Sequence, residues 1–324
     1  MGKFATYRPV NQERARMIET VELCRKFNGN TAVENLNLKV EKGEVFGLLG
    51  PNGAGKTTTI RMLACLIEQT SGTAYVNGFE INKEKDSPRI REIVGVLPES
   101  PGLYESLSAQ KNLNFFAQLY GIPRDKRNTR IEELLKMLDL WDRREEPIAT
   151  YSKGMKQKIA IARAFVHNPQ VVFLDEPTAG LDPAAALTVR EFLIALKKEG
   201  RTIFINSHHL DEVERLCDRI AVMNKTALAV GSPRELTRRY WGRTTVIELL
   251  DLKPGYVDLV RGFDFALNVR TADGRILVDL DDPETRNPVI VQALSKAGAK
   301  VEYVTELKRT LEDVYMKLVG AERR

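Results

Sequence analysis

Residues 50–57 read GPNGAGKT, and this stretch constrains the fold more strongly than any other feature of the chain. It stands between an apolar run at 44–49, which has the length of a buried strand, and a segment at 57–67 with helical spacing. Gly53 and Gly55 let the backbone curl so that successive N–H groups point at phosphate oxygens. The helix that follows presents its positive end to the same anion. The pattern therefore predicts a strand, a phosphate-binding loop and a helix in succession, as in an α/β fold.

Side chains in and beyond this loop indicate phosphoryl chemistry. Lys56 is placed to reach the β- and γ-phosphates of a nucleoside triphosphate, and the Thr57 hydroxyl to ligate Mg²⁺. Asp175 and Glu176 follow an apolar run at 171–174, and a carboxylate at the end of a buried strand points into the crevice where α/β sheets bind ligands. We expect Asp175 to hold Mg²⁺ and Glu176 to polarise the attacking water. The alternative is that Asp175 and Glu176 only cap the next structural element. It is weaker, because two consecutive carboxylates after a buried strand are costly without a cation to balance them.

Composition narrows the class of protein. With 324 residues the chain exceeds one average domain, and its 43% hydrophobic residues suffice to bury a core. A net charge of +5 does not by itself indicate nucleic-acid binding. Three widely spaced cysteines argue against a disulfide framework or a zinc site. No apolar stretch has the length of a membrane span, and residues 1–16 lack the apolar core of a signal peptide, so we expect a cytoplasmic protein.

The order of the predicted elements divides the chain. Residues 1–16 are polar and Arg-rich, which predicts a flexible arm. Residues 17–240 form the phosphate-binding domain, with a helical insertion at about 100–168. Residues 241–324 have the order βαββαβ, which predicts a small ferredoxin-like α+β domain. Its expected elements are strands at 245–250, 265–270, 275–280 and 300–305 and helices at 254–262, 288–297 and 310–318.

Further motifs follow the loop in order, and together they resemble the ATP-binding subunits of ABC transporters over residues 18–238. The motifs are YSKGMKQ at 151–157, VVFLDEP at 171–177, AGLD at 179–182 and NSHHL at 206–210. YSKGM resembles the LSGGQ signature of that family. The resemblance implies a P-loop nucleoside triphosphatase core of ABC type, ATP and Mg²⁺ as cofactors, and an ATP-dependent dimer with a second copy of the chain.

The resemblance also implies roles for individual residues. Ser152 and Gly154 match signature residues that reach the γ-phosphate bound to the opposite copy. Asp182 matches a loop that communicates between the two sites, and His208 matches a switch histidine on the γ-phosphate. Phe27 matches the aromatic that stacks on adenine, with an ordinary core aromatic as the alternative. The catalytic residues are then Lys56, Glu176 and His208; the metal ligands Thr57, Asp175 and Glu99; and the nucleotide-binding residues Phe27, Gly50, Asn52, Gly53, Gly55, Lys56, Thr57, Thr58, Glu99, Ser152, Gly154 and Asp182.

Some positions depart from the common family pattern. Glu99 stands at the lid position, where Gln is usual, and its carboxylate still offers an oxygen to Mg²⁺. Lys153 and Met155 replace the usual Gly and Gln of the signature. Lys153 either attracts the γ-phosphate or is simply solvated. These departures, and the sequence TLEDVYMKLVG at 310–320, resemble the export branch with its daunorubicin-type drug-resistance ATPases.

The resemblance favours an ATPase that powers a separate multi-span permease, on the inner face of the cell membrane, exporting drugs, lipids or polysaccharides. Residues near 99–116 would meet that permease, unless their apolar side chains serve ordinary core packing. Nucleic acid is not expected as a partner. The alternative is a soluble ABC ATPase acting on ribosomes, DNA or an assembly scaffold; a single GKT and the absence of a sustained heptad run weigh against it. A third interpretation makes the C-terminal domain a small-molecule sensor, although dimerisation or self-regulation is the simpler role.

Overall fold

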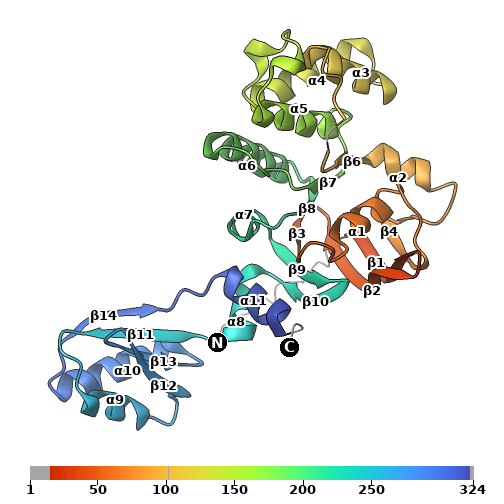
Figure 1. Ribbon diagram of the computed structural model, residues 1–324. Helices are drawn as coiled ribbons and strands as arrows, with labels where there is room; N and C mark the ends of the chain where they lie inside the picture. Colours follow the sequence, from red (N-terminus) through yellow and green to blue (C-terminus); the bar gives the residue numbers. More distant parts are fainter. Residues whose placement is uncertain (1–14, 101, 322–324) are drawn as a thin grey trace, which may run out of the picture. The chain divides into compact units, whose positions relative to one another are not determined.

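The computed structural model describes residues 15–100 and 102–321, and the chain divides between Gly231 and Ser232 into two compact units (Figure 1). The arm predicted at 1–16 lies outside the described residues except at its end, where Arg16 already begins strand β1. The second unit begins before residue 241 because helix α8 (Pro233–Trp241) packs against helix α11 (Leu311–Ala321).

A six-stranded sheet, in the order β10-β9-β3-β8-β7-β6, forms the centre of the first unit. Every residue of β3, β7 and β8 is buried, as befits parallel strands covered on both faces. The carboxyl ends of β3 and β7 therefore bring the phosphate loop and Asp175 to one edge of the sheet. The strands are β3 (Val45–Leu49), β6 (Val94–Leu97), β7 (Val171–Asp175), β8 (Thr202–Asn206), β9 (Arg219–Asn224) and β10 (Thr226–Gly231).

The sequence predicts a strand at 72–77, which is β4, but not the antiparallel sheet β2-β1-β4-β5 to which this strand belongs. In its two longest strands, β1 and β2, buried and exposed residues do not alternate strictly, and the pairing of these strands contains several register shifts. The alternation of apolar and polar residues that predicts a strand is therefore missing. Its apolar face shares one core with part of the central sheet. The strands are β1 (Arg16–Phe27), β2 (Asn30–Glu41), β4 (Ser71–Val76) and β5 (Phe79–Glu80).

Helices surround the central sheet, and three of them make up the predicted helical insertion. Figure 1 shows α3 (Ala109–Leu119), α4 (Arg124–Met137) and α5 (Lys153–Phe165) gathered together, away from β1 and β2. Helix α1 starts inside the phosphate loop and ends at Leu63, earlier than the predicted 67. The remaining helices of this unit are α1 (Lys56–Leu63), α2 (Ser87–Ile93), α6 (Pro183–Lys198) and α7 (Leu210–Leu216).

The second unit has the predicted βαββαβ order and an antiparallel sheet in the order β12-β13-β11-β14. Both helices between the strands pack on this sheet around a separate apolar core. Helix α10 begins at Pro283 rather than 288, because Pro283 opens its first turn and Pro288 lies inside it. The elements are β11 (Thr244–Leu249), α9 (Pro254–Arg261), β12 (Asn268–Ala272), β13 (Arg275–Asp279), α10 (Pro283–Lys296) and β14 (Val301–Glu306).

Candidate functional site

Glycine is required in the loop between β3 and α1. Gly55 precedes the helix with a φ of 94°, and a Cβ atom built there would lie 2.3 Å from the Ala32 carbonyl oxygen. A Cβ atom at Gly50 would lie 2.2 Å from the Met223 carbonyl oxygen. Gly53 has a φ of 82°. The backbone therefore adopts the curled path that the motif predicts, and larger residues cannot follow it.

The Lys56 ammonium is held inside this curl. Its Nζ donates to the carbonyl oxygens of Gly50 at 2.7 Å and Pro51 at 3.1 Å, and the residue is 7% exposed. Burial lowers the pKa of Lys56, whereas the nearby carboxylates of Glu176 and Asp175 act to raise it. The loop thus holds the Lys56 ammonium group by two backbone carbonyl oxygens. A phosphate oxygen can accept a further, charge-assisted hydrogen bond from the same ammonium group.

Asp175 lies at the end of β7 and joins two neighbouring elements. The Thr57 hydroxyl donates to Asp175 Oδ2 at 2.8 Å, and the Asn206 side-chain amide donates to its other oxygen. Thr57 belongs to α1 and Asn206 to β8, where it pairs in register with Asp175. The structure therefore brings Thr57 and Asp175 together, as their predicted roles require. Asn206 was missed, although an amide that ends the neighbouring parallel strand was a usable signal.

The next residue, Glu176, contacts the predicted switch histidine. Its Oε1 lies 2.7 Å from Nδ1 of His208, which stands in the short connection between β8 and α7. Glu176 Oε2 is buried and has no hydrogen-bond partner among the described residues. The backbone of Glu176 is left-handed, with a φ of 51°. An unpartnered carboxylate oxygen beside the phosphate loop is suited to accept a proton or a water hydrogen bond.

Two predicted residues cap helices near this edge. The Ser152 hydroxyl accepts from Met155 N at 3.2 Å and so begins α5, and Asp182 accepts from Ala185 N at 2.9 Å and begins α6. Gly154 lies close to the start of α6, since a Cβ atom there would come within 3.4 Å of Ala185 Cβ. Neither Ser152 nor Gly154 makes a hydrogen bond to the phosphate loop within the described part of this single copy.

The remaining predicted residues lie at the surface or in the loop. Phe27 is 41% exposed at the end of β1, with the Arg25 guanidinium 4.4 Å from its ring centre, so it is not a core aromatic. Glu99 is exposed beyond the end of β6. Asn52 is exposed in the phosphate loop, and Thr58 is half-buried in α1. Phe27 and Glu99 therefore have side chains that are accessible to a ligand.

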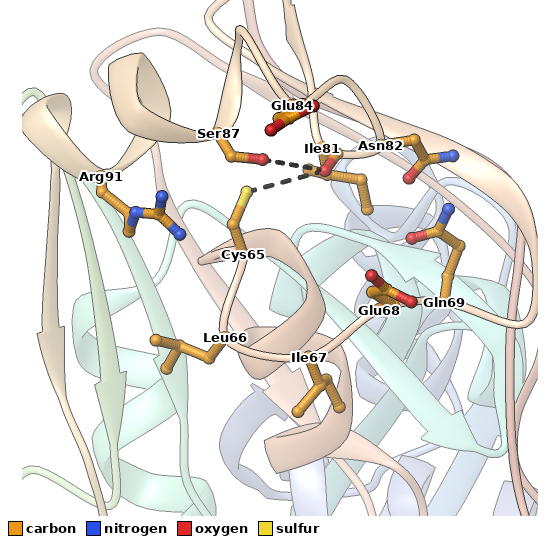
Figure 2. A pocket seen from close by; sticks show the side chains of 10 residues that line it. All are labelled: Cys65, Leu66, Ile67, Glu68, Gln69, Ile81, Asn82, Glu84, Ser87 and Arg91. Carbon is orange, nitrogen blue, oxygen red and sulfur yellow. Dashed lines mark hydrogen bonds between the residues drawn. The ribbon is translucent and has the colours of Figure 1, made fainter.

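A hollow at the end of α1 lies apart from these residues. Figure 2 shows the side chains around it, among them Cys65, Glu68, Glu84 and Arg91. Its volume is about 740 Å³. Cys65 Sγ approaches the Ile81 carbonyl oxygen at 4.0 Å, and burial raises the pKa of this thiol. The hollow contains none of the predicted site residues, so it belongs to a different surface from the phosphate loop.

Comparison with known proteins identifies the family. Residues 33–179 match the family model described as ABC transporter. The linearmycin resistance ATP-binding protein LnrL of Bacillus subtilis is 31% identical, and the match covers 94% of this chain and 98% of LnrL. The daunorubicin/doxorubicin resistance ATP-binding protein DrrA of Streptomyces peucetius is 34% identical, over 96% of this chain and 94% of DrrA. The chain belongs to the ATP-binding proteins of ABC transporters.

The fold of this ABC protein agrees with a solved relative. A dimeric post-hydrolysis structure of the ATP-binding cassette MJ0796 bound to ADP and Pi superimposes with a TM-score of 0.61 at 25% identity, covering 67% of this chain and 98% of that one. The predicted export-branch resemblance is confirmed by relatives named for drug resistance, and the activity of the family is ATP hydrolysis. No helix among the described residues is long and apolar enough to cross a membrane.

Proposed function

We propose that two copies of this ABC protein close on two molecules of ATP and power a separate multi-span permease that exports drug-like compounds at the inner face of the cell membrane. The observation that carries the proposal is the convergence of Lys56, the Thr57–Asp175 pair and the Glu176–His208 pair beside one phosphate loop. The names of LnrL and DrrA, both resistance proteins, support export of antibiotic-like molecules.

In this proposal each side chain has one duty toward ATP. The backbone N–H groups of the loop and the Lys56 ammonium bind the β- and γ-phosphates. Glu176 Oε2 orients the attacking water and withdraws its proton while Oε1 stays paired with His208. His208, whose side chain is 58% exposed, contacts the γ-phosphate. Phe27 stacks on the adenine from its exposed position on β1.

The residues present fit Mg²⁺. Thr57 and Asp175 offer hard oxygen atoms already 2.8 Å apart, and Glu99 is exposed and able to add a carboxylate oxygen. Asn206 holds the Asp175 carboxylate in place by its amide. When bound, Mg²⁺ neutralises the charge that develops on the transferring phosphoryl group.

A second copy would complete the site. Ser152 and Gly154 stand at the beginning of α5, and in this proposal they contact the γ-phosphate held by the facing copy. The dimeric state of the MJ0796 cassette supports this arrangement. Asp182, which begins α6 close to Gly154, would pass the state of one site to the other.

An aromatic surface on the helical insertion suits the permease. Tyr104, Phe115 and Phe116 contact one another, with ring centres 5.0 to 6.1 Å apart, and Tyr104 is 49% exposed. A hollow of about 400 Å³ beside Phe116 is also lined by Arg91 and Arg163. Aromatic and arginine side chains are enriched in protein interfaces.

Two measurements test the proposal. Purified protein with Mg²⁺ and ATP should release phosphate, and Lys56→Ala should abolish that release, because the charge-assisted contacts to the phosphates are lost. Pull-down from membranes of the source cell should recover a multi-span protein, and Tyr104→Asp combined with Phe116→Asp should lose it while keeping ATPase activity. Recovery of ribosomes instead of a membrane protein would contradict the transport role.

A further inference from the structure

The half-buried side chain of Gln157 joins helix α5 to the turn that follows β7. Its Nε2 donates to the carbonyl oxygens of Glu176 at 3.3 Å and Pro177 at 3.1 Å. Gln157 lies in the second turn of α5, the helix that Ser152 begins. The Gln157 amide group therefore connects the signature segment (residues 151–155), which begins α5, to the backbone of Glu176 in the same copy.

The backbone of Glu176 has a strained conformation that neighbouring contacts must hold in place. Glu176 is not glycine, yet its φ is 51°, in the left-handed region. Such a conformation persists only where surrounding contacts hold it. Glu176 N donates to Asn206 O at 2.9 Å on the sheet side, and the side chain pairs with His208. Gln157 supplies the restraint from α5, at the carbonyl end of the same residue.

A second contact links α5 to the far end of the same loop. Gly180 has a φ of 69°, and a Cβ atom built there would lie 2.4 Å from Lys153 Nζ. The Lys153 side chain thus occupies the space that a side chain at position 180 would need. With Gln157 at Glu176 and Lys153 at Gly180, the first two turns of α5 contact the loop at both ends. Helix α5 therefore has direct contacts to both ends of the loop that carries Glu176.

We propose that Gln157 is a positioning residue that couples the signature segment to hydrolysis: it transmits the position of α5 to the Glu176 carboxylate of the same copy. The inference rests on the proposed function, in which Ser152 at the start of α5 meets the nucleotide of the facing copy. Each copy then aligns its own general base only when its α5 is engaged by the ATP of its partner. Through Gln157, occupancy of one site controls turnover at the other.

The experiment compares variants of the full chain by steady-state ATPase assays and by binding of a fluorescent ATP analogue. Gln157→Glu keeps the shape of the side chain but removes the N–H donors, and Gln157→Leu removes all hydrogen bonding. Both should lower kcat by about 10- to 100-fold, the cost of misplacing a reacting group by about 1 Å, and change KM by less than about twofold. Gln157→Lys, whose ammonium donates to both carbonyls, should restore most of kcat. Lys156→Gln is the matched control, because Lys156 is adjacent on α5 and pairs with Glu105 at 2.8 Å instead.

Three outcomes decide the matter. Wild-type kcat in Gln157→Glu would overturn the inference, as would a Gln157→Lys protein that is as slow as Gln157→Leu, because the donor would then be irrelevant. A raised KM with unchanged kcat would also overturn it. Unchanged phosphate release by Lys56→Ala, or recovery of ribosomes instead of a membrane protein, would instead refute the proposed function, so the two failures are distinguishable. Thermal unfolding of each variant identifies any loss of activity that comes from misfolding.

Discussion

Replacing Glu176 by Gln should stop hydrolysis while leaving ATP binding intact. Gln has nearly the shape of Glu, so its Oε1 can still accept from His208 Nδ1 when that nitrogen carries the proton. The NH₂ group then takes the place of the buried, unpartnered Oε2, which is the atom free to receive a proton from water. The Glu176→Gln variant therefore loses the general base but keeps the hydrogen bond to His208.

The size of the effect follows from this loss. General-base catalysis contributes about 10²- to 10⁴-fold, which corresponds to roughly 3–5 kcal/mol of activation free energy. The contacts of Lys56 to Gly50 and of Thr57 to Asp175 do not involve the Glu176 side chain, so ATP affinity should change by less than about threefold. Because hydrolysis no longer removes the γ-phosphate, ATP should hold two copies together.

Phosphate release measures the first consequence and size-exclusion chromatography the second. With Mg²⁺ and ATP the Glu176→Gln protein should elute as a dimer, and with ADP as a monomer. Adding Ser152→Arg should return it to a monomer, because the larger side chain obstructs the facing site. Turnover at the wild-type rate would refute the assignment of Glu176. A slow variant that stays monomeric with ATP would refute the two-copy arrangement.

The remaining predictions concern the loop, the lid and a buried histidine. Gly55→Ala should weaken ATP binding by about tenfold or more, because a left-handed alanine costs roughly 1–2 kcal/mol and its Cβ atom would collide with the Ala32 carbonyl oxygen. A titration that gives the variant the same ATP affinity as the wild type would contradict the loop geometry. Glu99→Gln should keep most ATPase activity, since both side chains offer an oxygen to Mg²⁺; a loss as deep as that of Glu176→Gln would make Glu99 a primary catalytic group. Burial lowers the pKa of His167 from 6.5 to about 4. Between these two values the unfolded chain binds a proton that the folded chain excludes. The free energy of unfolding should therefore fall by up to ~3 kcal/mol as the pH drops from 6.5 to 4. His167→Gln should remove that part of the acid sensitivity in urea unfolding at pH 7 and pH 4.5, and identical losses in both proteins would contradict it.

The sequence alone predicted the parts of this protein that local chemistry dictates. GPNGAGKT needs left-handed glycines and an adjoining helix, so its path follows from the residue types themselves. The fully buried strands β7 and β8 were predicted because strands covered on both faces appear as bare apolar runs. The βαββαβ order of the C-terminal domain followed from alternating helical and strand-like segments with an Asp273-Gly274 turn.

Only the tertiary structure decided which distant residues meet. Strands β1 and β2 were missed because their burial is set by an irregular pairing with each other and by the core they share, not by alternation along the chain. Asn206 reaches Asp175 because β7 and β8 pair in parallel at that register, and Gln157 reaches Glu176 because α5 packs against the turn after β7. The motifs name the residue types that phosphoryl transfer needs, and the packing of strands and helices determines which of them share one site.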